Sequence, residues 1–315
     1  MHARRVVITA AVILGALLGP ASAGASEVIG RDARAVSLEI NAKGVALVTW
    51  RDPNGFRKVL AWGAVNARHP TASVKQIGFR LDYSGGLRSF GPNYWRRFRD
   101  ASQPYDGPAL AWFVMARKAP DGSYWALQKW QRLLPNYGYK PWSPLRRAWE
   151  LRLSHWTGEP PKLELWTDWI GQGAAHHLYG RLTYQGVPVH GFGNTNTGVP
   201  TDSYGRNVYL DTFNSAYGNG WKRENSFLTH RPNGNFCYGF WKHKGYDGRI
   251  RPKGQGAQYR ATVIGPGVTP DAYWEGAGLP PYDPGNPDHV AHEDAMNSLG
   301  DSLVANDPDD PCTLH

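Results

Sequence analysis

The chain has 315 residues, of which 41% are hydrophobic and 19% charged, and its formal net charge is +9. Its 14 tryptophans, 16 tyrosines, 37 glycines and 24 prolines favour strands joined by tight turns over long helices. The positive charge favours anionic partners. No Lys/Arg tract lies in a nucleic-acid-binding motif, so we do not expect nucleic acid as a partner.

The N-terminus has the layout of a secretory signal peptide. Arg4 and Arg5 precede an apolar run at 6–19, and small residues follow as Ala-Ser-Ala at 21–23 or Ala-Gly-Ala at 23–25. The run is shorter than the roughly 18–20 apolar residues that a membrane span needs. We therefore expect cleavage of 1–25 and a secreted or cell-wall-associated protein with no membrane segment. Cleavage removes two of the 35 basic residues and none of the 26 acidic ones, which leaves a charge of +7.

The first part of the mature chain, 26–133, has the pattern of an antiparallel β-meander. Alternating apolar residues predict strands, and Asp-Pro-Asn-Gly and Ala-Pro-Asp-Gly segments predict the turns between them. The expected strands are 36–40, 45–51, 56–62, 74–83, 112–117 and 124–132.

Aromatic and basic residues alternate at 94–99, where Arg96 and Arg97 follow Tyr94 and Trp95. Such a cluster can bind an anionic ligand through cation–π and ionic contacts. The alternative is that the arginines lie over apolar surface with their charged ends in water. Arg96 and Arg97 are candidate ligand-binding residues.

A Pro-rich connection at 134–146 is the predicted domain boundary, although 26–275 could form one domain. The C-terminal β-region, 147–275, has further strand patterns, the last at 258–264, and prolines from Pro266 on argue against more pairing. An acidic tail, 276–315, has a helical pattern from about 289 to 304. The predicted fold is all-β, either a large antiparallel β-sandwich or two packed β-meanders, with a short C-terminal helix.

The strand patterns at 148–156 and 162–170 predict a hairpin whose loop is 157–161. In that register Glu150 lies opposite Asp168, with Cβ atoms ~5 Å apart. This spacing suits the roughly 5–5.5 Å between the carboxyl groups of a retaining glycosidase. Trp166 could stack on a sugar ring, and Arg152 could keep one carboxylate ionised. The alternative is a solvated sheet face, and a register error of one residue removes the pairing.

His176 and His177 are adjacent on a predicted strand, so they point to opposite faces, one toward the core and one toward solvent. The spacing to His190, His230 and Asp211 matches no metal motif, and we expect neither a metal site nor a cofactor.

The two cysteines of the chain, Cys237 and Cys312, predict one disulfide in an exported protein. An unpaired cysteine nucleophile would be incompatible with that bond.

Two segments carry a resemblance to a known group of proteins. They are Asp-Gly-Ser-Tyr-Trp-Ala-Leu-Gln at 121–128 and Tyr-Leu-Asp-Thr-Phe-Asn-Ser-Ala-Tyr at 209–217. Here the chain resembles secreted β-rich proteins of high-GC Gram-positive bacteria without assigned activity, over most of the mature length. The resemblance implies export and supplies no catalytic residue.

The leading functional prediction is a secreted, non-enzymatic β protein that binds glycans or anionic cell-envelope polymers. One alternative is a secreted glycan hydrolase that uses Glu150 and Asp168. A second alternative is a structural or protein-binding exported protein. The sequence does not define the ligand or the oligomeric state.

Overall fold

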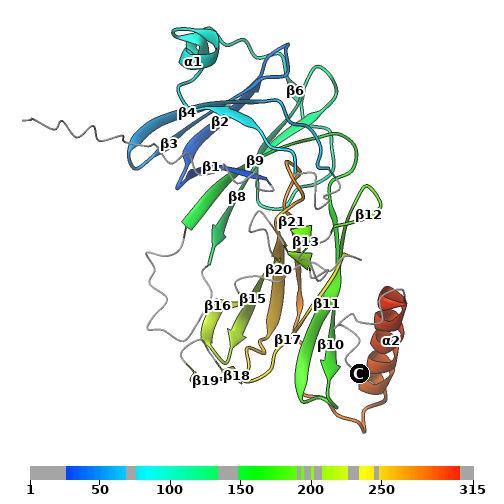
Figure 1. Cartoon of the computed structure of the whole chain (residues 1–315). Coiled ribbons are helices and arrows are strands. Elements are labelled where there is room, and N and C mark those ends of the chain that lie inside the picture. The colour runs from blue at the N-terminus through cyan, green and yellow to red at the C-terminus, as the bar shows by residue number, and fades with distance from the viewer. Residues whose placement is uncertain are drawn as a thin grey trace, which may run out of the picture.

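The computed structural model describes residues 26–68, 76–133, 148–189, 193–194, 200–201, 208–225, 234–244 and 248–305. Within these ranges four antiparallel sheets of four or five strands form two β-sandwiches, and a C-terminal helix lies beside the second (Figure 1). The predicted all-β class is confirmed.

The first sandwich packs a five-stranded sheet against a four-stranded sheet. Its core includes Val48 and Val59 from one sheet and Trp125 and Leu151 from the other. The five-stranded sheet has the order β1 (Glu27–Arg31), β9 (Ala148–Trp156), β8 (Tyr124–Arg132), β7 (Phe113–Lys118), β6 (Gln103–Pro104). The four-stranded sheet has the order β2 (Arg34–Ile40), β3 (Ala46–Asp52), β4 (Gly55–Trp62), β5 (Arg80–Asp82). The 112–132 hairpin and the antiparallel order β2–β3–β4–β5 are confirmed. Of the expected strand 74–83, the described residues form a strand only at Arg80–Asp82, and 26–133 divides between the two sheets.

The second sandwich also packs two sheets, around buried residues such as Leu178, Leu210, Phe240 and Val263. One sheet contains β10 (Lys162–Ile170), β11 (Ala175–Tyr184), β12 (Val187–Pro188) and β17 (Asn235–Gly239). The other has the order β16 (Gly218–Asn225), β15 (Val208–Ser215), β20 (Gln258–Val263), β21 (Ala272–Ala277). Two short hairpins pair β13 (Gly193–Asn194) with β14 (Pro200–Thr201) and β18 (His243–Lys244) with β19 (Ile250–Arg251).

Helix α2 (Pro287–Val304) lies alongside β10 and confirms the predicted C-terminal helix, starting two residues earlier than expected. Asn286 caps it by accepting a hydrogen bond from the Asp288 N–H. Shorter helical turns, α1 (Leu87–Phe90) and η1 (Tyr94–Arg97), cover the outer face of the sheet β2–β5. Among the described helices, none is both long and apolar enough to cross a membrane.

Strands β9 and β10 have the predicted bounds, but they do not pair with each other. β9 lies between β1 and β8 in the first sandwich, whereas β10 pairs with β11 in the second. The hairpin prediction is therefore wrong. The segment 157–161 instead carries the chain from one sandwich to the other, and the Thr157 N–H donates to the Asn66 side chain at 2.8 Å.

The predicted boundary at 134–146 links β8 and β9, which are neighbours in one sheet. The first sandwich thus needs 148–156 as well as 26–133, because β9 supplies part of its core. The expectation that pairing ends at 264 is also wrong. Residues 264–271 form a loop, after which β21 pairs along the full length of β20.

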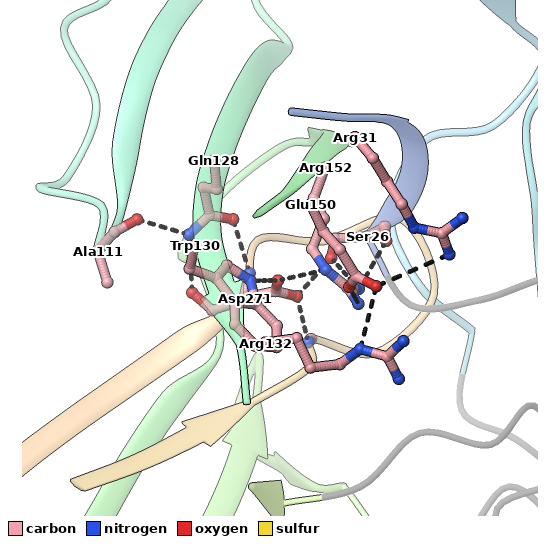
Figure 2. A network of polar contacts seen from close by, with 10 residues as sticks. Ser26, Arg31, Ala111, Gln128, Trp130, Arg132, Glu150, Arg152 and Asp271 are labelled. Carbon is pink, nitrogen blue, oxygen red and sulfur yellow. Dashed lines mark hydrogen bonds and ion pairs between the residues drawn. The ribbon is translucent and has the colours of Figure 1, made fainter. Parts of the chain in front are cut away.

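The loop between β20 and β21 holds the two sandwiches together. The His155 N–H donates to the carbonyl of Val268 at 2.7 Å, and the rings of Trp130 and Tyr209 lie 5.7 Å apart. Asp271, at the end of the loop, enters a buried polar network on the five-stranded sheet (Figure 2). The junction is therefore packed and hydrogen-bonded.

Candidate functional site

Exposed and half-buried side chains over α1, η1 and β4 form an aromatic and basic surface, which we call the Trp95 surface. Its members are Phe56, Lys58, Leu87, Arg88, Phe90, Tyr94, Trp95, Arg96 and Arg97. Lys58 Nζ lies 5.1 Å from the centroid of the Trp95 ring, and Arg96 Cζ lies 5.2 Å from it. Phe56 packs against the same ring, with centroids 5.6 Å apart. A half-buried indole thus has two cations over its ring.

A tight turn before α1 brings this surface together. Gly85 and Gly86 have φ of 70° and 95°, a region that disfavours other residues. A Cβ at Gly85 would lie 2.5 Å from the Lys58 side chain and 3.1 Å from Trp95. Glycine at this position therefore lets the cation approach the indole. The Trp95 N–H also donates to the Gly85 carbonyl at 3.2 Å.

The charged side chains in the segment that forms most of the Trp95 surface are all positive. Residues 83–99 include four arginines and neither Asp nor Glu. None of these four arginines forms an ion pair with a carboxylate in the described ranges. Arg97 donates to the Pro92 carbonyl at 3.0 Å and Arg99 to the Phe98 carbonyl at 3.1 Å. Guanidinium donors of this surface therefore stay available to an anion.

The two flanking carboxylates, buried Asp82 and exposed Asp100, both accept hydrogen bonds from nearby groups. Asp82 accepts hydrogen bonds from Ser84 and Ser89, and Asp100 accepts from the backbone N–H of Ile40. Burial raises the pKa of Asp82, but the hydrogen bonds from Ser84 and Ser89 outweigh it and hold the pKa below its ordinary value. Asp82 thus serves the turn, whereas Asp100 bonds to Ile40 and Ser102.

Glu150 and Asp168 do not face each other, because β9 and β10 belong to different sheets. Glu150 is 2% exposed and forms ion pairs with Arg152 Nη2 at 2.7 Å and Arg132 Nε at 3.1 Å. Asp168 is buried in the second sandwich, opposite His177 on β11, and accepts from the Trp169 N–H. The geometric premise of the hydrolase hypothesis is therefore wrong, although Arg152 does pair with one carboxylate as expected.

The other predicted ligand-binding residues lie in three separate places. Arg152 is buried within the junction network. Trp166 is half-buried beside Tyr179, with ring centroids 6.0 Å apart. Arg96 and Arg97 are exposed and adjacent on η1. Of these residues, only Arg96 and Arg97 lie together on an exposed surface. Lys58 and Phe56, which contact the neighbouring Trp95, come from β4, outside the 94–99 motif.

The adjacent histidines point to opposite faces of β11, as predicted, but neither faces solvent. His176 hydrogen-bonds the Tyr259 hydroxyl, whereas His177 stacks on Tyr179 at 5.0 Å. Burial lowers the pKa of each to about 4, with Lys253 adding to the effect at His176. His190 and His230 lie outside the described residues. In the described part of the chain, no three His, Cys, Asp or Glu side chains gather to hold a metal.

Cys237 lies on β17 directly opposite Tyr179 of β11. The Tyr179 hydroxyl donates to the Met296 carbonyl, so this face of the sheet is the one that α2 covers. Cys312 lies outside the described residues, and the Cys237–Cys312 disulfide stays a prediction.

Glu224 is a buried acid that the sequence pattern did not reveal. It is the extra residue of a bulge, because Leu210 pairs with Asn225 and Asp211 with Arg223. The Tyr238 hydroxyl donates to its Oε1 at 3.4 Å, and burial raises the pKa of Glu224 to about 8. The alternation of apolar and polar residues does not reveal a bulge, so the local sequence could not predict that Glu224 is buried.

The fold and the Trp95 surface define a protein class, an all-β protein of two sandwiches with an exposed aromatic and arginine-rich surface. No family model, curated protein or solved structure matches the chain.

Proposed function

We propose that this chain is a secreted, non-enzymatic β protein that binds glycans or anionic cell-envelope polymers through the Trp95 surface. The observation that carries the proposal is the contact of the Trp95 indole with both Lys58 and Arg96, next to the segment 83–99, which contains no Asp or Glu. Secretion rests on the signal-peptide layout of 1–25.

The chemistry of this surface suits a polymer that carries repeated anions on sugar rings. Aromatic rings such as Trp95 and the exposed Phe90 present flat apolar faces to a sugar. Guanidinium groups bind carboxylate or phosphate through paired N–H donors. The positive charge of the whole chain raises the local concentration of such a polymer. Because the cations are exposed, binding should weaken as salt screens them.

Affinity electrophoresis in gels that contain polygalacturonate tests the proposal, with a neutral glucan as the uncharged comparison. The double variant Arg96→Ala/Arg97→Ala should bind polygalacturonate about tenfold more weakly, a loss of roughly 1.4 kcal/mol. Trp95→Leu should weaken binding as well, because the aromatic face is lost. Unchanged thermal unfolding would show that each variant is folded.

The matched control removes the same charge from the second sandwich, where Lys242 and Lys244 are exposed. Lys242→Ala/Lys244→Ala should retain nearly full affinity. An equal loss of affinity in both double variants would mean that binding depends on the net charge of the protein and not on the Trp95 surface. Absence of binding to polygalacturonate and to peptidoglycan at low salt would refute the proposal and favour a structural or protein-binding role.

A further inference from the structure

A half-open pocket of about 160 Å³ lies where the two sandwiches meet. Ala67 and Arg68, which follow β4 of the first sandwich, form one wall. Residues within 184–189, around the turn between β11 and β12, and Pro266 in the loop before β21 form the others. Figure 1 shows β12 and the loop before β21 at this junction. The pocket therefore depends on the packing of both sandwiches, and junctions between domains are common places for small-ligand sites.

The walls of this pocket are held in place by hydrogen bonds of the protein itself. The buried amide of Gln76 accepts from the Arg68 N–H and donates to the Arg68 carbonyl, both at 2.7 Å. Gly267, whose Cβ would lie 2.8 Å from Gln76 Oε1, lets the loop before β21 pack against this amide. On the opposite wall the Tyr184 hydroxyl donates to Asn66 Oδ1 at 2.9 Å. Because the walls are already ordered, a ligand has little conformational entropy to remove.

The side chains of the pocket suit an aromatic ring better than a sugar ring. The apolar lining residues are Ala67, Val187, Pro188, Val189 and Pro266. An apolar cavity of roughly 150 Å³ holds one benzene molecule, so this pocket has room for a single six-membered ring. The hydroxyl groups of a sugar would lose water here, and that loss is costly without new hydrogen bonds. Tyr184 already donates to Asn66, which leaves the Gln185 amide as the main neutral side-chain partner.

Arg68 gives the pocket its charge. It is the one charged residue among those that line the pocket, and it is exposed to solvent. In the described part of the chain its side chain forms no ion pair with a carboxylate. A guanidinium group binds a carboxylate through paired N–H donors. The pocket thus combines room for one apolar ring with a cation, and it favours an acid over an amine.

We propose that this pocket binds a small aromatic carboxylate, with the ring among Val187, Pro188 and Pro266 and the carboxylate on the guanidinium group of Arg68. The ligand is held without a covalent bond and contacts both sandwiches. This inference goes beyond the proposed function, because no member of the Trp95 surface lines the pocket. Its test therefore succeeds or fails independently of polymer binding.

Benzoate is the probe for this site, titrated into the full chain at neutral pH and followed by calorimetry or saturation-transfer NMR. We expect one saturable site with an affinity in the millimolar range, as suits so small a ligand. Benzylamine carries the same ring with a positive charge, and galacturonate carries a carboxylate on a sugar ring. Each should bind at least about tenfold more weakly than benzoate.

Two variants at exposed positions test the assigned contacts. Arg68→Gln should weaken benzoate binding about tenfold, because the cation is lost. Val187→Glu, at a side chain that is 44% exposed, places a carboxylate at the pocket and should weaken benzoate binding while strengthening that of benzylamine. The matched control Arg34→Gln removes the same charge from exposed β2 and should bind benzoate as the native chain does. Unchanged thermal unfolding would show that each variant is folded.

Three results would overturn the inference. The first is the absence of saturable benzoate binding to the native chain. The second is full benzoate affinity in Arg68→Gln, or equal affinity of the native chain for benzylamine, since either would remove the carboxylate from Arg68. The third is galacturonate binding as tight as that of benzoate, which would make the pocket a sugar site.

Discussion

Glu224 illustrates how burial can keep a carboxyl group neutral at a pH where it is ordinarily charged. Its side chain is 6% exposed, and Gly254 lies so close that a Cβ at that position would overlap the carboxyl group. Hydrogen bonds from Tyr238, at 3.4 Å, and from Tyr217 and Thr212 lower the pKa but do not offset the loss of water. Burial therefore dominates, and a pKa of about 8 means that the folded protein keeps Glu224 largely protonated at neutral pH.

This protonation makes stability depend on pH in a definite direction. The folded pKa of about 8 exceeds the ordinary value of 4.5, so the stabilising contribution is complete below 4.5 and is lost as pH rises toward 8. Glu224→Gln cannot ionise and should gain stability relative to the native chain between pH 5 and 8, on the order of 3 kcal/mol. Urea unfolding at both pH values measures the gain.

Glu164→Gln is the control for this measurement. Hydrogen bonds from Lys162 lower the pKa of Glu164, against the effect of burial, and Arg181 lowers it further. Its variant should therefore show no relative gain on going from pH 5 to pH 8. Parallel pH profiles for Glu224→Gln and the native chain would contradict the assigned protonation.

At the scale of elements, the bounds of β9 and β10 were predictable from sequence but their partners were not. β9 and β10 begin and end at the expected residues, because alternation and the flanking turn are local signals. Gly158 in the connecting segment adopts φ 74°, as in many hairpin loops. The same short segment can also pass between sheets. β9 pairs with β8 and β1, and the apolar faces of these strands form part of the core of the first sandwich. The pairing of β9 therefore depends on residues that are distant in the sequence.

The candidate surface shows the same limit. The aromatic and basic cluster around Arg96 and Arg97 was visible as a motif of adjacent residues. The second cation over the Trp95 ring is Lys58, which the fold brings in from β4. Glu150 and Arg152, two residues apart on one strand, pair as predicted, whereas Asp271 approaches them from a distant loop. In the Trp95 surface and in the network around Glu150, the sequence thus predicted the members that are close together in the chain. It did not predict Lys58 or Asp271, which the fold brings in from elsewhere.

Helix α2 contacts the second sandwich through hydrogen bonds and through ring contacts of Trp169 with His289 and His292. His292 Nε2 hydrogen-bonds the Thr167 carbonyl at 3.0 Å, and the Asn235 side chain donates to the Leu303 carbonyl at 2.9 Å. The second contact brings the C-terminal end of the helix to β17, two residues before Cys237. This placement suits the predicted bond to Cys312 and gives the disulfide a role, to hold a helix with a small apolar face.

Cys312→Ser should therefore loosen α2 without unfolding the sandwiches. In the chain-entropy model a loop of this length contributes roughly 4 kcal/mol, which is an upper figure. We expect faster amide hydrogen exchange in α2 and β10 and faster proteolysis within 287–304. Exchange in the first sandwich, for example in β3, should be unchanged. Alkylation of two thiols in the secreted native chain without reductant would contradict the disulfide.

For the whole molecule, composition predicted the class of fold, and the junction determines how its two halves behave together. Aromatic residues pack across it, as Trp130 does against Tyr209, and Asp271 and Gln128 connect the two sandwiches by hydrogen bonds. Buried polar networks are stabilising only when their members are satisfied. The junction should therefore respond sharply to the loss of a single partner.

Gln128 is the residue whose loss tests this coupling. It is fully buried on β8, where its amide group donates to the Asp271 carbonyl at 3.0 Å and accepts from the Asp271 N–H at 2.8 Å. Gln128→Leu leaves both backbone groups without partners, at a cost of about 1–3 kcal/mol for each. Calorimetry should show one unfolding transition for the native chain and two separated transitions for the variant. Gln131→Leu, at a half-buried position on the same strand, should keep the single transition. If Gln128→Leu unfolds in one step at the native temperature, the two sandwiches are coupled by their apolar contacts, and the polar network has another role.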